Sequence, residues 1–171
     1  MGRMPDTGGT RSAQLAAQFE TAQAAFLGLV ESLTDEQWRL AGKNHPKRIN
    51  DEDEGRTVGV IAHHAAISGE MIMGRIQTML ERRPLTPPNS REVNAKHAVE
   101  HAEVSRAEVA LVLRESGPRL AAAVRAIPDD QLDEPRDTPV GPMSIAQRVE
   151  LVLIGHLQAH QGSIEAAIAA D

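Results

Sequence analysis

Apolar residues recur at steps of three and four positions in four long stretches of this chain, the spacing that lines one face of an α-helix. The pattern predicts helices over residues 12–33, 57–83 and 105–126, and a fourth that opens at residue 144. The second helix stops before Pro84, because proline cannot continue a helix. No stretch shows the strict alternation of a half-buried strand, so we expect an all-α fold.

Helix starts are marked by a serine or threonine followed three residues later by glutamate or glutamine, the capping-box pattern. It occurs at Thr34–Gln37, where it begins a short turn carrying Trp38, at Ser105–Glu108 and at Ser144–Gln147. Each motif satisfies backbone N–H groups that a helix end otherwise leaves without partners. We therefore expect helical turns to begin at these three points.

The connections between the predicted helices are long. Residues 42–56 are polar and read as a surface loop, prolines crowd residues 84–88 and 128–142, and residues 91–103 look helical but polar. Helices joined in this way fit a four-helix bundle with long crossover connections. We expect a flexible tail over residues 1–10 and one domain over residues 11–171.

Composition excludes several classes of function. The chain has no cysteine, so it can form no disulfide, thiolate metal site or cysteine nucleophile. Its net charge is −6 with scattered cations and 2% aromatic residues, which argues against nucleic acid as a partner. No segment resembles a signal or a membrane span. We expect a cytoplasmic protein that acts on a small molecule without a membrane partner.

His156 and His160 carry the clearest chemical signal in the sequence. They stand four residues apart on the predicted fourth helix, so their rings lie about 40° apart around its axis and one turn along it. They also occupy the apolar stripe, between Val152 and Ile164. A buried polar ring without a partner costs about 1–3 kcal/mol, and one metal ion would satisfy both rings.

The second helix supplies a third histidine. His64 shares a face with Ile61 and Ser68 of the inner stripe, whereas His63 is turned roughly 100° away from it. Three neutral imidazoles with open positions for water suit one divalent ion, Zn²⁺ or Ni²⁺ above all. The alternative left open is that all three rings are satisfied core groups without a metal.

His97 and His101 share the same spacing but a different setting. Lys96, Glu100 and Glu103 surround them, and we interpret this pair as part of a solvated helix face.

The combination of these features resembles the DinB/YfiT-like superfamily, which includes thiol-dependent S-transferases and the mycothiol-dependent maleylpyruvate isomerase. The resemblance is carried by a helix that opens with Thr57-Val58-Gly59 and reaches His64, a proline-rich crossover, and a last helix with His156-x3-His160. It implies an up-down-down-up bundle, often dimeric, with a metal ion held by His64, His156 and His160. A homodimer also agrees with the alanines along the first helix, although alanine is simply a good helix former.

The resemblance also bears on residues around the metal. It implies that Asn94 faces the site, while Arg56 stands where many members have tryptophan, so the pocket wall differs. From the helical spacing, Arg75 returns to the face of His64 about three turns later and is a second candidate for binding substrate.

Two functions of different classes agree with these features. The first is a metal-dependent transferase or hydrolase in which the ion activates a low-molecular-weight thiol or a water for attack on a small electrophile. The second is a stress-response protein that binds a metal or ligand without turnover.

Overall fold

The computed structural model describes residues 10–43, 56–87 and 89–170, and the regular structure of these segments is helical. Residues 1–9 of the predicted tail and residues 44–55 of the predicted loop lie outside the described residues. The elements, in chain order, are α1 Arg11–Ser32, α2 Asp35–Arg39, α3 Val58–Leu80, α4 Ser90–Glu100, α5 Arg106–Arg125, η1 Asp129–Gln131, α6 Ile145–Gln147, η2 Arg148–Ile154 and α7 Gly155–Ile168.

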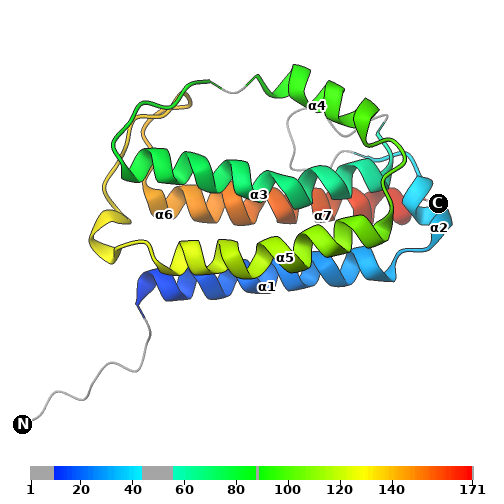
Figure 1. The fold of residues 1–171 in the computed structure, drawn as a ribbon, viewed down its shortest axis with the longest axis horizontal. Coiled ribbons are helices and arrows are strands. Elements are labelled where there is room, and N and C mark those ends of the chain that lie inside the picture. The colour runs from blue at the N-terminus through cyan, green and yellow to red at the C-terminus, as the bar shows by residue number, and fades with distance from the viewer. Residues whose placement is uncertain (1–9, 44–55, 88, 171) are drawn as a thin grey trace, which may run out of the picture.

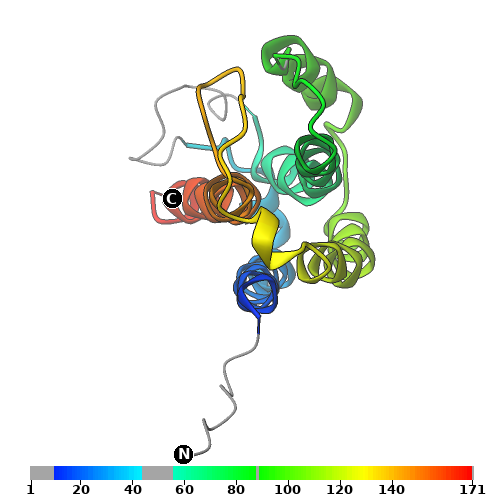
Figure 2. The ribbon, with the colours of Figure 1, turned by 90° about the vertical axis from the view of Figure 1, so that its left-hand side faces the viewer.

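Four long helical segments form a bundle: α1, α3, α5 and the run from α6 through η2 to α7. Figure 1 shows that α1 and α7 run in one direction while α3 and α5 run in the other. The predicted four-helix bundle with up-down-down-up order is therefore confirmed. Seen end-on in Figure 2, the four segments surround one core, and α4 lies outside them beside α3. None of the described helices is long and apolar enough to cross a bilayer.

Side-chain hydroxyls define the starts of the helices. The three predicted capping boxes, headed by Thr34, Ser105 and Ser144, are all formed, because each hydroxyl accepts a backbone N–H three residues on and each glutamine or glutamate reaches back. Thr10 and Thr57 cap α1 and α3 with a single such bond. These caps fix where each apolar stripe begins and hence which residues face the core.

The stripes meet in one continuous core. Its largest fully buried side chains include Phe19, Phe26, Ile61, Ile76, Leu113, Leu153 and Ile164. The helix predicted around Pro118 is continuous through that residue, and the buried amide of Gln23 donates to the carbonyl of Leu113 at 2.6 Å, one turn upstream. Polar and apolar contacts thus join α1 to α5 across the bundle.

Trp38 of α2 contacts both α3 and the segment before α5 at one end of the bundle. Its indole N–H donates to the carbonyl of Val104 at 2.8 Å, in the connection between α4 and α5. Its ring also lies against Gly59, where an added Cβ would come within 2.5 Å of the indole nitrogen. This contact fixes the position of the start of α3. It therefore also fixes the position of His63 and His64, which lie about one turn further along the helix.

The fourth helical segment is not regular. Residues 148–154 form a π-helix, which ends where the N–H of Gly155 bonds to the carbonyl of Glu150. A π-helix holds more residues per turn and therefore shifts the phase of the helical residues that come after it. Val152, expected on the inner stripe, is only half-buried, while Leu153 and Ile154 are buried. His156 and His160 lie directly after this shift.

Candidate metal centre

His64, His156 and His160, the predicted ligand set, come together in the structure. Each offers a ring nitrogen, and the three nitrogens lie within 4.8 Å of one another. The ring centroids of His156 and His160 are 4.4 Å apart, and those of His64 lie 5.2 and 5.0 Å from them. The geometry results from two antiparallel neighbours, α3 and α7, of which α7 supplies two residues one turn apart.

The surroundings keep the ring of His64 neutral. His160 is fully buried, and the pKa of His64 is lowered to about 2 by burial first, and then by His160, His156, Arg56 and His97. An imidazole binds a metal only through an unprotonated nitrogen. His64 is therefore in its metal-binding form at neutral pH.

The donor set fits a divalent ion that prefers imidazole. Zinc bonds histidine nitrogen at about 2.0–2.1 Å, so nitrogens in a tetrahedral site lie roughly 3.3 Å apart. A small closing movement of the three rings is enough to reach this spacing from the observed one. Three protein ligands would leave further positions for a water or a substrate atom, the arrangement typical of catalytic sites.

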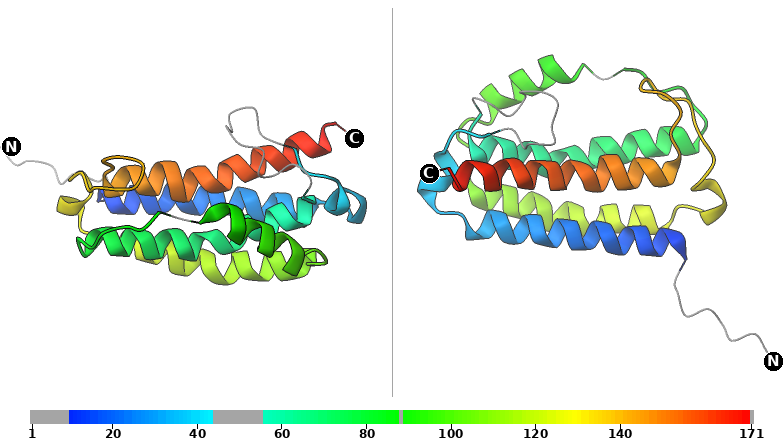
Figure 3. Two further views of the ribbon diagram at one scale, coloured as in Figure 1. Left: turned by 90° about the horizontal axis from the view of Figure 1, so that it is seen from above. Right: turned by 180° about the vertical axis from the view of Figure 1, so that it is seen from behind.

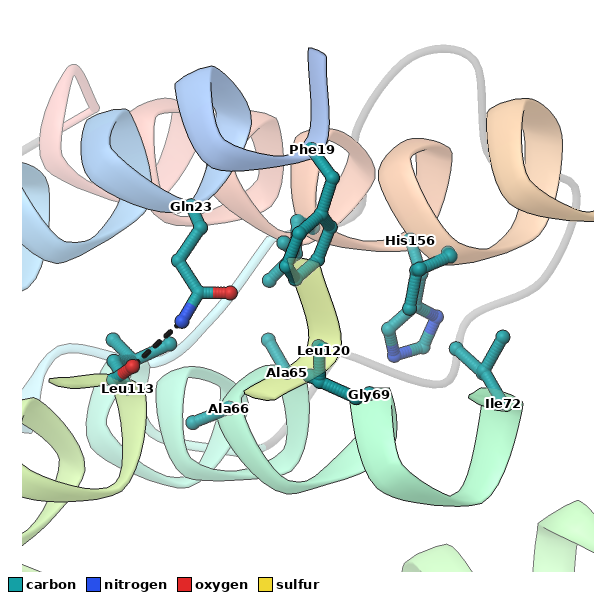
Figure 4. Close-up of a pocket in the computed structure, with 11 residues that line it drawn as sticks. Phe19, Gln23, Ala65, Ala66, Gly69, Ile72, Leu113, Leu120 and His156 are labelled. Atoms are coloured by element: carbon teal, nitrogen blue, oxygen red, sulfur yellow. Dashed lines mark hydrogen bonds between the residues drawn. The ribbon is translucent and has the colours of Figure 1, made fainter. Parts of the chain in front are cut away.

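One side of the triad is closed by the packed core. Figure 4 shows His156 at the edge of an interior cavity lined by residues such as Phe19, Leu120 and Ile72. The cavity measures about 10 Å³, which holds no more than a single water. A substrate therefore cannot approach His156 through the core between α1 and α5.

Arg56 introduces a cation beside the triad. Its side chain is 8% exposed, and its charge lowers the pKa of both His64 and His97, after burial and the neighbouring histidines. Its backbone is fixed at the start of α3, because its carbonyl accepts the N–H of Gly42 at 2.6 Å. A buried guanidinium at this place favours an anionic group on whatever binds to the ion.

The two candidate substrate residues lie in different parts of the molecule. Asn94 is half-buried in α4, on the face that also carries His97. Arg75 lies about 16 Å further along α3 than His64 and donates to the carbonyl of Thr86 at 3.0 Å in the crossover. The structure thus places Asn94 one turn from His97 on α4 and places Arg75 about three turns from His64 on α3.

The interpretation of His97 and His101 as a solvated face is wrong. His97 is only 7% exposed, and its Nε2 lies 2.8 Å from Nδ1 of His63. His101 joins them, and the ring nitrogens of these three histidines also lie within 4.8 Å of one another. The physical reason is that Lys96, which pairs with Glu100, occupies the outer side of α4, while the histidines face α3. The four-residue spacing of His97 and His101, which repeats that of His156 and His160, was the signal in the sequence that pointed to this second group.

A family comparison accounts for this architecture. The family model described as the DinB superfamily matches residues 18–164. The chain belongs to the DinB superfamily. Among solved structures, this DinB-superfamily chain is similar to YfiT from Bacillus subtilis, with 19% identity and a TM-score of 0.71 over 98% of this chain and 93% of that one. No curated protein sequence matches the chain.

YfiT is described as "a probable metal-dependent hydrolase with an unusual four-helix bundle topology". At this level of identity the likeness establishes the fold that the two DinB-type chains share.

Proposed function

We propose that this protein is a metal-dependent enzyme in which one divalent ion, zinc or nickel, is bound by His64, His156 and His160. The observation that carries the proposal is the convergence of three ring nitrogens from α3 and α7 within 4.8 Å, one of them on the fully buried His160. The description of YfiT as a probable metal-dependent hydrolase supports it. The reaction is attack by a small-molecule thiol, or by water, on a small electrophile.

The ion, when bound, would act as a Lewis acid that lowers the pKa of a coordinated thiol or water. His64, His156 and His160 would hold it, and the last of these is fully buried. The apolar wall around Phe19 and Leu120 excludes bulk water from the inner side of the site. Arg56 places a fixed positive charge where an anionic nucleophile or substrate carboxylate would lie.

The charge of Arg56 favours an anionic nucleophile, which can be a thiolate or the hydroxide that a metal-bound water becomes. Since the chain has no cysteine, a thiol would have to be a separate small molecule. A thiol-dependent transferase and a hydrolase both fit this charge.

The test is an assay of untagged protein reconstituted with zinc or with nickel. Conjugation of a reactive electrophile is measured with bacillithiol, mycothiol and glutathione, and ester hydrolysis is measured without a thiol. The proposal expects one reaction to exceed background and to fall by at least a hundredfold in His160→Gln.

Gln158→Ala is the matched control, because Gln158 lies on the same helix between His156 and His160 but is exposed. It is expected to keep the wild-type rate. Background rates with both metals, all three thiols and water would instead identify a protein that binds metal or ligand without turnover.

A further inference from the structure

Among the described residues, the histidines that the proposed function leaves unused form a second cluster on the other side of α3. His63 comes from α3, His97 from α4, and His101 is the residue that ends α4. Their ring centroids are 5.0, 4.1 and 4.8 Å apart, and those of the first triad are 4.4 to 5.2 Å apart. The two clusters therefore meet the same geometric requirement for a shared ion.

The burial of two of these rings distinguishes the cluster from histidines that lie close together on a protein surface by chance. His63 is 8% exposed and His97 is 7% exposed. Within the described parts of the chain, Nδ1 of His97 is buried and has no hydrogen-bond partner, although Nε2 of the same ring is 2.8 Å from His63. Burying such a nitrogen costs free energy, so the ring of His97 is not part of a solvated face.

The docking of α4 gives a second, independent observation. His97 is the one buried residue along the described helix α4, while Val93 and Val99 are 58% and 79% exposed. Figure 3, left, shows α4 lying across α3. A helix that buries no apolar side chain gains little from the hydrophobic effect, so the histidine contacts must account for much of its attachment.

Charges of both signs lie around the cluster. Glu108 acts electrostatically on His63. At His97 the effect of Arg56 is larger than the opposing effect of Glu100. Arg56 therefore acts on both clusters, and Glu100 and Glu108 act on the second.

We propose that His63, His97 and His101 bind a second divalent cation of the zinc class, and that this ion clamps α4 against the bundle. The ligands come from two separate elements, so the ion links them in the way that structural metal sites link short segments. The hydrogen bond between His63 and His97 is what these rings form when they hold no ion, and the ion would take its place. The two ions would be neighbours, since the rings of His64 and His97 are 5.6 Å apart.

The first test is the zinc content of untagged protein after equilibrium dialysis, measured by mass spectrometry. The proposal expects two ions per wild-type chain, one in His101→Gln, one in His160→Gln and none in the double variant. Lys96→Gln, on the exposed side of α4, is the matched control and should keep both. His63→Gln serves in place of His101→Gln if the latter does not fold by circular dichroism.

The outcomes separate this proposal from the proposed function. One ion in the wild type that survives His101→Gln but not His160→Gln overturns the second site alone. One ion that survives His160→Gln but not His101→Gln overturns the proposed metal centre and leaves the second site.

The second test asks whether the ion clamps α4. Amide hydrogen exchange of residues 90–100 should slow at least tenfold on addition of zinc in wild type and in His160→Gln, but not in His101→Gln. Exchange in α4 that does not respond to zinc in the wild type would overturn the clamp.

Discussion

The rings of His63 and His64 belong to different histidine clusters, although the two residues are neighbours in the chain. Successive helical residues point about 100° apart, so one helix can present histidines to two partners. His64 faces α7, where it meets His156 and His160, and His63 faces α4, where it meets His97 and His101. The ring centroids of His64 and His97 are 5.6 Å apart, so the two clusters are in contact with each other.

Replacement of Arg56 should weaken binding of anions without loss of metal. In Arg56→Gln we expect a thiol that carries a carboxylate to bind the cobalt-substituted protein about tenfold to a hundredfold more weakly, because a charge-assisted hydrogen bond contributes about 1.5–3 kcal/mol. Binding is measured from the absorption of the cobalt–thiolate complex. Arg39→Gln, an exposed arginine on α2, is the control. Equal affinity in both variants would show that Arg56 does not receive the anion.

Replacement by alanine should have opposite effects on the stability of the protein at two glycines of α3. In Gly59→Ala the new Cβ would lie 2.5 Å from the indole nitrogen of Trp38, so we expect a loss of about 1–3 kcal/mol in the free energy of unfolding. In Gly74→Ala the Cβ meets nothing within 4 Å, and the change should stabilise the helix by about 0.5–1 kcal/mol. Urea unfolding of both variants decides this. A change of the same sign in the free energy of unfolding of both variants would contradict the contact between Trp38 and Gly59.

Metal-free protein should lose stability as the pH falls below about 6.5. The pKa of His64 is lowered to about 2 in the folded chain, mainly by burial, whereas an exposed histidine titrates near 6.5. Between these values the unfolded chain binds the additional proton, so the contribution of His64 is complete above pH 6.5 and declines toward pH 2. The slope is at most about 1.4 kcal/mol per pH unit.

Urea unfolding at pH 7.5 and 5.5 measures this slope, and His64→Gln should show a shallower one. An unchanged slope in the variant would mean that His64 is protonated in the folded protein.

The sequence was sufficient for the parts of the fold that depend on local signals. The capping boxes at Thr34, Ser105 and Ser144 each satisfy backbone groups with side chains a few residues away, so they can be recognised without the tertiary structure. His156 and His160 could be singled out for a similar reason, since an imidazole in an apolar stripe is conspicuous. Their convergence with His64 was expected from the place of His64 on the inner stripe of another helix and from the family resemblance.

The features that were missed depend on packing between elements. His97 has charged neighbours on its own helix, and its burial arises from His63 on another helix, which no local pattern encodes. The π-helix over residues 148–154 is equally invisible in the apolar spacing, because it changes the number of residues per turn rather than their type.

The central claim is that His64, His156 and His160 share one ion, and anomalous X-ray scattering from crystals of the zinc-loaded protein, measured above the zinc absorption edge, tests it most directly. We predict an anomalous peak about 2.0–2.1 Å from one ring nitrogen of each of these three histidines. Well-ordered rings at all three positions with no peak between them would contradict the account.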